Sequence, residues 1–212
     1  MRFGVLITLF LAFISCKNVS ERETEQVQMV VDSTGLKIKT VEKQTENFKL
    51  TSFLEHPIDL QEFKKSKNRN HTTTGVSNGT DYYFEPKIKD SIFYKYNYPT
   101  ENFTDSKRID QIVVFKYGKN KHKYKDETEI LIELRVFNKD LDLGKANLVG
   151  LTKTELESEF GNDYLTFDNG IAYSNKNKVL ILELDKSKVN SYRYVKLNTE
   201  KIDNNLIGQI TK

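Results

Sequence analysis

The sequence predicts an α+β fold built from two tandem units, each a short helix packed on a four-stranded antiparallel sheet. One observation behind this prediction is a helix-start signal that occurs twice, as Asp59 with Glu62 and as Thr152 with Glu155. In such a capping box the first side chain accepts from the backbone N–H three residues on, and the acidic side chain reaches back. The other observation is that aromatic and β-branched segments separated by turn residues follow each signal, as in antiparallel strands.

The second unit, residues 140–212 with a C-terminal tail, has the clearer pattern. Its helix is expected at 153–160, with Gly161 as the left-handed residue that ends it. The dipeptide Asn169-Gly170 predicts a hairpin turn between its first two strands. Its four strands are expected at 163–167, 171–174, 179–184 and 189–197.

The first unit, residues 48–139, repeats this order. Its helix signal lies at 58–63, and its four strands are expected at 79–84, 91–98, 109–117 and 128–137. Chance agreement between the two halves stays open as the alternative, because capping boxes are common. The segment 138–144 has oxygen ligands at alternate positions but lacks the glycine and glutamate of a calcium loop, so it is interpreted as the linker between the units.

The N-terminus has the layout of a secretory signal peptide at residues 1–15. Arg2 precedes the apolar run Phe3–Ile14, which is shorter than the roughly 17–25 residues that a transmembrane helix needs. Cys16, the only cysteine, follows Ser15 where this run ends. Residues 16–47 are then expected to be a tether, which could include a short hairpin.

The stretch "FISC" that ends at Cys16 resembles the lipobox of bacterial lipoproteins. The resemblance implies that Cys16 is lipidated, with acyl chains such as palmitate, and that the membrane is a partner through this lipid. Lys17 is not the aspartate associated with inner-membrane retention, which favours an outer-membrane anchor facing the periplasm. An ordinary secretory signal with an incidental cysteine is the alternative.

Composition argues against several classes of function. Loss of residues 1–15 removes only Arg2 among the charged residues, so the net charge falls from +3 to +2. Nucleic-acid binding domains usually carry a clustered basic excess, so no nucleic-acid partner is expected. The chain has three histidines and one cysteine, too few to suggest a zinc site, and no cofactor or metal is expected.

The helix of the second unit also resembles a known family. The stretch "GLTKTELESEFG", Gly150 to Gly161, is similar to the motif of the SmpA/OmlA-type (BamE-like) outer-membrane lipoproteins, although Asn162 stands where a proline often follows. A tandem pair of helix-plus-sheet units is similar to the β-lactamase inhibitor protein fold. Both resemblances imply a protein that contacts other proteins through its sheet or loops and is not an enzyme.

A basic stretch between two predicted strands is the candidate binding surface. It interleaves tyrosines with lysines that could hold an anionic ligand, namely Lys116, Lys119, Lys121, Lys123 and Lys125. A second basic run lies at 64–71, and the two would form a cationic patch if they met in space. The competing interpretation is a solvated hairpin tip with no ligand.

Three functions follow from these features. The first is a non-enzymatic lipoprotein that docks another envelope protein, in assembly or maintenance of the outer membrane. The second is a periplasmic inhibitor or immunity-type lipoprotein that blocks a hydrolase or toxin. The third is an envelope hydrolase that uses Asp81, Glu85 and Asp90. Residues 75–79, "GVSNG", match a nucleophile elbow, but the order of the flanking elements is reversed, so a turn is expected there and no catalytic residue is assigned.

Overall fold

The computed structural model describes residues 47–67, 71–76, 79–99, 108–139 and 141–212. The predicted signal peptide, Cys16 and the tether up to residue 46 therefore lie outside the described residues. None of the described helices is long and apolar enough to cross a membrane.

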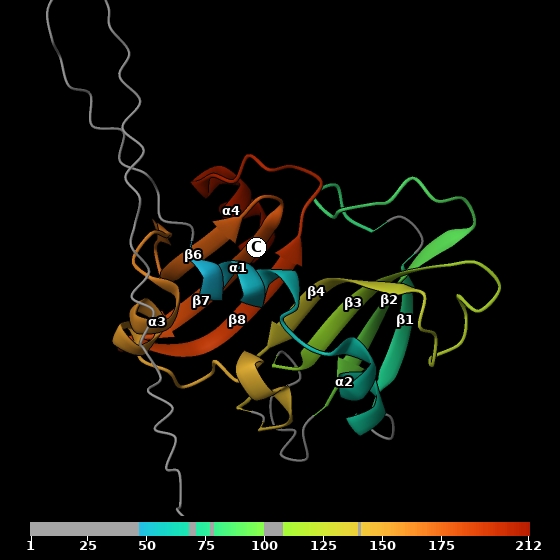
Figure 1. The fold of residues 1–212 in the computed structure, drawn as a ribbon, viewed down its shortest axis with the longest axis horizontal. Helices are drawn as coiled ribbons and strands as arrows, with labels where there is room; N and C mark the ends of the chain where they lie inside the picture. The colour runs from blue at the N-terminus through green and yellow to red at the C-terminus, as the bar shows by residue number, and fades with distance from the viewer. Residues whose placement is uncertain (1–46, 68–70, 77–78, 100–107, 140) are drawn as a thin grey trace, which may run out of the picture. The chain divides into compact units, whose positions relative to one another are not determined.

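Eight strands form one antiparallel sheet in the order β1-β2-β3-β4-β8-β7-β6-β5 (Figure 1). The strands are β1 Thr72–Val76, β2 Ser91–Tyr98, β3 Asp110–Tyr117, β4 Glu129–Val136, β5 Leu165–Phe167, β6 Gly170–Asn175, β7 Lys178–Asp185 and β8 Lys188–Lys196. Strands β4 and β8 pair from Glu133↔Val195 to Val136↔Tyr192. The strands β1–β4 and β5–β8 are therefore joined edge to edge in one sheet, where the sequence predicted two separate four-stranded sheets.

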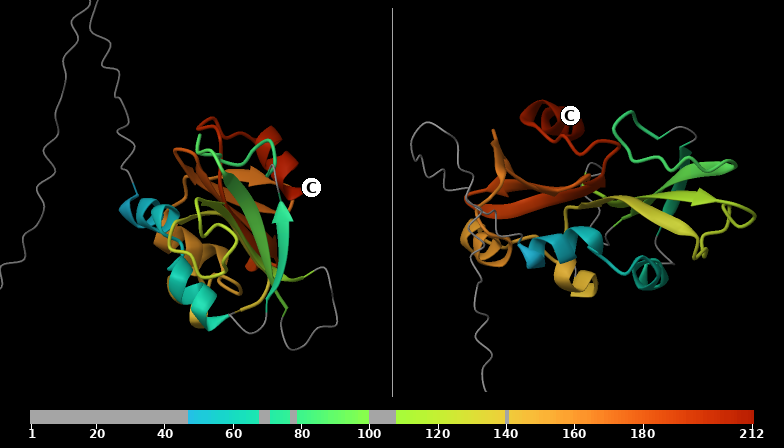
Figure 2. Two further views of the ribbon diagram at one scale, coloured as in Figure 1. Left: turned by 90° about the vertical axis from the view of Figure 1, so that its right-hand side faces the viewer. Right: turned by 45° about the horizontal axis from the view of Figure 1, so that its top comes forward.

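Helices cover both faces of this sheet. They are α1 Phe48–Glu55, α2 Leu60–Ser66, α3 Lys153–Phe160 and α4 Asn204–Thr211, with a 3₁₀ segment η1 Leu141–Ala146 between β4 and α3. The right-hand view of Figure 2 shows α4 on one side of the sheet and α1, α2 and α3 on the other. The sheet is consequently the middle layer of three.

Two apolar cores follow from this layering. In β3, Ile112 and Val114 belong to the core under α1, α2 and α3, whereas Val113 and Phe115 belong to the core that includes α4. A strand that is covered on both faces has a continuous apolar sequence, because alternate side chains are buried on opposite sides of the sheet. This explains the unbroken "IVVF" of β3.

The predicted helix at 153–160 is confirmed as α3. Glu155 N donates to Thr152 Oγ1 at 3.2 Å, and Thr152 N donates to Glu155 Oε2 at 2.7 Å, which completes the capping box. Gly161 ends the helix with φ 79° and ψ −174°, a positive-φ conformation that differs from the expected left-handed one. At the other signal, Glu62 N donates to Asp59 Oδ1 at 2.9 Å and α2 follows.

Two helices, α1 and α4, were not predicted from the sequence. The helix α1 contacts β6, β7 and α3, and Asn175 Nδ2 donates to Thr51 Oγ1 at 2.7 Å. The helix α4 lies in the segment predicted to be a tail, and it buries Ile207 and Ile210 against the sheet. Each helix has only eight residues, so its apolar face is too short to give a clear periodic signal.

The strand predicted at 79–84 is wrong. This segment makes a single bridge, Tyr83↔Leu197. The strand that completes the first group of four is instead β1, which is exposed at four of its five residues. An edge strand with so little burial has no apolar alternation to reveal it. The turn predicted at Asn169-Gly170 also shifts by one residue, because Phe167 pairs with Gly170 and leaves Asp168 and Asn169 as the turn.

Candidate functional site

The basic stretch singled out in the sequence forms the connection between β3 and β4. We call residues 118–128 the basic hairpin. Its backbone is folded back by two turns, in which Lys121 N donates to Gly118 O at 3.2 Å and Lys123 N donates to Asn120 O at 2.8 Å. Gly118 begins the hairpin at φ 75°, a conformation that glycine adopts without steric cost.

A stripe of aromatic rings supports the hairpin. Tyr94, Tyr96 and Tyr98 alternate along β2, so their side chains lie on one face of the sheet. Tyr124 of the hairpin packs edge-on against Tyr96 with ring centroids 5.0 Å apart. His71, from the second basic run, stacks on Tyr124 at 4.0 Å with an interplanar angle of 14°. The two basic runs therefore meet through aromatic contacts.

Two buried lysines bind the hairpin backbone. Lys64 Nζ of α2 donates to Tyr124 O, and Tyr124 OH donates back to Lys64 O at 2.9 Å. Lys116 Nζ of β3 donates to Lys123 O. The side chains of Lys64 and Lys116 are 3% and 0% exposed. These ammonium groups therefore hold two consecutive carbonyl groups of the hairpin in place.

Glu129, at the start of β4, balances these charges. Its side chain has no exposed area, and its Oε1 lies 2.7 Å from Lys64 Nζ while its Oε2 lies 3.6 Å from Lys116 Nζ. Gln61 Nε2 donates to Glu129 Oε1 at 2.9 Å and to Asp126 O at 3.0 Å. Because a buried charge is tolerated only when it is paired and hydrogen-bonded, this carboxylate is what allows both lysines to be buried.

Asp126 is the second carboxylate of this buried cluster. Its Oδ1 accepts from Thr128 N at 3.1 Å and from Thr128 Oγ1 at 2.9 Å. Burial alone would raise the pKa of Asp126, but these hydrogen bonds and the charges of Lys116 and Lys64 outweigh it, and the pKa is lowered. Burial lowers the pKa of Lys116, against the opposing effect of Glu129. Both pKa shifts follow from the close packing of the buried cluster.

The predicted patch lysines separate into three groups. Lys119, Lys123 and Lys125 are exposed at the tip of the hairpin. Lys121 lies 2.7 Å from Asp90 Oδ1 and is partly neutralised. Lys116 differs from the prediction, because its burial removes it from the accessible surface. Three of the five lysines thus carry exposed charge without a described ion pair.

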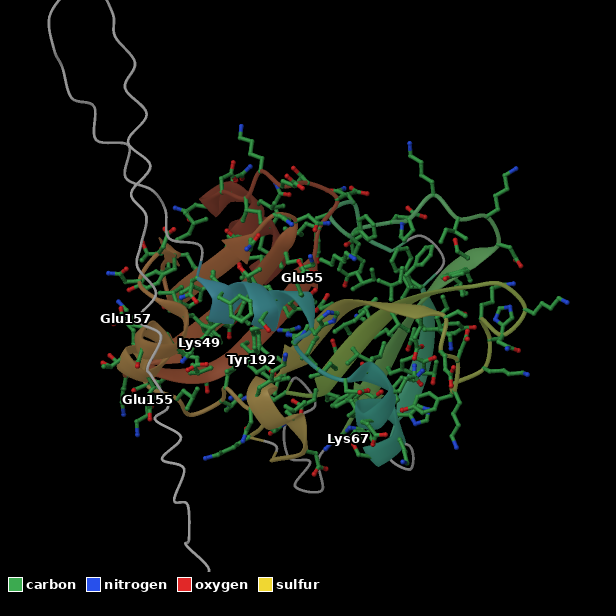
Figure 3. All side chains as sticks on the ribbon, in the orientation of Figure 1. Lys49, Glu55, Lys67, Glu155, Glu157 and Tyr192 are labelled. Carbon is green, nitrogen blue, oxygen red and sulfur yellow. The ribbon has the colours of Figure 1, made fainter. Side chains whose placement is uncertain are left out.

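The described lysines of the second basic run are each buried or paired with a carboxylate. Lys65 is exposed, but its Nζ lies 3.7 Å from Glu62 Oε1. Lys64 is buried in the cluster, and Lys67, at the end of α2 in Figure 3, lies 3.7 Å from Asp142. The two runs do meet, but they form a buried ion-pair cluster beneath the hairpin instead of the exposed cationic patch that such a meeting was expected to give. Gln61, Asp126 and Glu129 were not predicted, because the contacts that bring them together join residues far apart along the chain.

The other candidates from the sequence do not assemble into a catalytic site among the described residues. Asp81 and Glu85 are exposed, and Asp90 pairs with Lys121. In the segment predicted as a turn, Gly75 belongs to β1, while Ser77 lies outside the described residues. Within the described part of the chain, His, Cys, Asp and Glu side chains form no group of three or more that could hold a metal ion.

The hairpin and its buried cluster thus make a fixed, positively charged projection at the β3–β4 end of the sheet. No protein-family model, curated protein or solved structure matches this chain.

Proposed function

We propose that this protein is a bacterial lipoprotein, anchored to the outer membrane through Cys16 and facing the periplasm, that docks another envelope protein and has no enzymatic activity. The observation that carries the docking proposal is the basic hairpin, which displays three exposed lysines on a backbone held by two buried ammonium groups. An acidic surface on the partner is the complement of this charge.

Fixing the hairpin before binding favours docking on energetic grounds. Ordering a flexible side chain at an interface costs roughly 0.5–1.5 kcal/mol, and ordering a loop adds to this cost. The contacts of Lys64, Lys116 and Asp126 already order the hairpin in the free protein, so this cost belongs to folding and not to binding. The partner then meets a backbone that is already in position, and long-range attraction to the lysines speeds encounter.

We further propose that the chain is a tandem repeat of two helix-plus-sheet units, related in design to the two-unit inhibitor fold that it resembles. Supporting this, Phe63 of α2 packs edge-on against Tyr98 of β2, with ring centroids 5.1 Å apart. Phe160 of α3 packs in the same way against Tyr173 of β6, at 5.6 Å. In both cases a helix meets the second strand of the four that follow it along the chain.

Capture from the native envelope tests the docking proposal. The tagged, lipidated protein is crosslinked and purified, and bound proteins are identified by mass spectrometry. The test variant combines Lys119→Glu, Lys123→Glu and Lys125→Glu. The matched control reverses three exposed lysines elsewhere, Lys145, Lys186 and Lys201, so that both variants have the same net charge.

We expect the hairpin variant to recover at least tenfold less of the partner than the wild type, while the control variant recovers it fully. If the lipid anchor positions the protein for docking, a Cys16→Ala form, which lacks the anchor, should no longer capture the partner. Equal capture by the hairpin and control variants would overturn the role of the hairpin. Recovery of one hydrolase or toxin, with or without the anchor, would replace docking with the inhibitor function.

A further inference from the structure

A groove of about 660 Å³ lies between α4 and the strand ends of β5 to β8. Its lining comes from β5, the β5–β6 turn, β7, β8 and α4. Because Asn204, Gly208 and Thr211 of α4 line it, the groove is on the side of the sheet where Figure 2 shows α4. Its volume falls within the roughly 300–1,000 Å³ of ligand sites in proteins. None of the hairpin residues lines it.

The lining of the groove is rich in amides and carboxylates and contains no lysine or arginine. Asn169, Asn190 and Asn204 each offer an acceptor oxygen and a donor NH₂, and Asp168 and Glu183 offer acceptors only. A sugar hydroxyl is both a donor and an acceptor, so it matches this set. An anionic ligand does not, because two carboxylates would repel it.

The polar groups of the groove fall into a fixed and an unengaged set. Ser191 Oγ donates to Glu183 Oε2 at 2.6 Å, and Arg108 Nη2 donates to Asn190 Oδ1 at 2.8 Å, so these two acceptors are held in place. The side chains of Asp168, Asn169 and Asn204 make no hydrogen bond to other described residues. They remain available for a ligand, while Phe167 gives the groove an apolar surface suited to the CH face of a pyranose ring.

Gly208 keeps one wall of the groove open. It lies inside α4, and a Cβ placed on it would meet no other atom within 4 Å. Glycine in a helix interior is less favourable than alanine by roughly 1 kcal/mol. Packing does not require this glycine, and its effect is to leave space beside the polar side chains of the groove.

We propose that this groove binds a neutral oligosaccharide, with Asp168, Asn169 and Asn204 bonding its hydroxyl groups and Phe167 contacting a ring face. The donors and acceptors of the groove match the hydroxyl groups of such a ligand, and the apolar side chain matches its ring carbons. The space beside Gly208 leaves room for the width of the sugar chain. The site is separate from the basic hairpin and goes beyond the docking function.

Isothermal titration of the full chain in detergent with two oligosaccharides tests this proposal. The probes are a tetramer of β-1,4-linked N-acetylglucosamine and a tetramer of β-1,4-linked glucose, used up to ~10 mM because weak affinity is expected for an open polar groove. We expect saturable binding of at least one of them. Binding of the first alone assigns the acetamido group to the ligand, and binding of both assigns the hydroxyl groups.

Two leucine substitutions on α4 make the test specific. Gly208→Leu fills the groove, and we expect it to lower the affinity at least tenfold. Gln209→Leu adds a similar side chain at an exposed position of the same helix that does not line the groove, and the affinity should be unchanged. Leucine is a better helix former than glycine, so the thermal midpoint of Gly208→Leu should not fall, which separates a blocked groove from a misfolded protein.

A double variant, Asn169→Ala with Asn204→Ala, should also weaken binding at least tenfold. The proposal is overturned if neither oligosaccharide binds the wild type saturably, or if Gly208→Leu and Gln209→Leu bind equally well. Stronger binding of inorganic phosphate than of both sugars at the same site would also overturn it.

Discussion

Replacing Glu129 by glutamine should strongly destabilise the protein. The Glu129 carboxylate has no exposed area, accepts from Lys64 Nζ at 2.7 and 2.8 Å, and lies 3.6 Å from Lys116 Nζ. In the wild type, Glu129 and Asp126 offset the two buried lysines. In Glu129→Gln two ammonium groups remain buried and only Asp126 opposes them.

The size of this effect follows from the burial of the pair. Removing one partner of a buried ion pair lowers the free energy of unfolding by about 3–5 kcal/mol, because the other charge is left uncompensated. For a chain of this length each kcal/mol corresponds to about 2–4 °C, so the thermal midpoint should fall by roughly 6–20 °C. Burial lowers the pKa of Lys116, so the deficit should shrink as the pH rises toward about 10 and this amine loses its proton.

Urea denaturation followed by circular dichroism measures this loss. The matched control is Glu127→Gln, which removes an exposed carboxylate two residues earlier and should change stability by less than about 0.5 kcal/mol. The double variant Lys64→Met with Glu129→Leu should recover much of the stability, since apolar residues often replace a buried ion pair at little cost. If Glu129→Gln is no less stable than Glu127→Gln, the buried cluster does not hold the hairpin.

Three further variants test local features. Asp126→Asn should be less stable than the wild type at pH 7. The pKa of the Asp126 carboxyl is lowered in the folded protein, so its contribution is fully present above the unfolded pKa of about 3.9 and is lost as the pH falls through the folded pKa. The difference in stability should therefore shrink as the pH falls below about 4. Thr152→Ala removes the helix cap and should cost about 1 kcal/mol in urea titrations, whereas Thr154→Ala, at an exposed position of the same helix, should cost nothing. Gly79→Ala should cost roughly 1–3 kcal/mol, because φ is 61° and the new Cβ would lie 2.9 Å from the Phe93 ring; an unchanged urea midpoint would contradict this.

Features that depend on neighbours along the chain were predictable from the sequence. The capping box of Thr152 and Glu155 lies within one helical turn, and the strands β3 and β7 are long apolar runs bounded by turns. Because these signals are local, the helix and the strands could be predicted without knowing the tertiary fold. The exposed β1, with three threonines and a glycine, gave no such signal.

The candidate site depended instead on contacts between distant residues. Lys64 and Glu129 are 65 positions apart, and Gln61 and Glu129 are 68 apart. In the sequence, Lys116 looks like the other lysines of its stretch. Its burial depends on its place on β3, where its Nζ lies over the Tyr94 ring of the neighbouring strand. A basic run therefore predicted the position of the hairpin but not which of its lysines remain accessible.

The hairpin and the groove should act independently. The hairpin rests on β2, β3 and α2, whereas the groove is formed by α4, β5, the β5–β6 turn, β7 and β8. No residue contributes to both. Substitutions at separate sites that share no partners usually have additive effects. Reversing Lys119, Lys123 and Lys125 should therefore leave oligosaccharide affinity unchanged, and Gly208→Leu should leave partner capture unchanged. A change in either measurement would mean that the β4–β8 junction transmits strain between the two halves of the sheet, because it is the strand pairing that joins them.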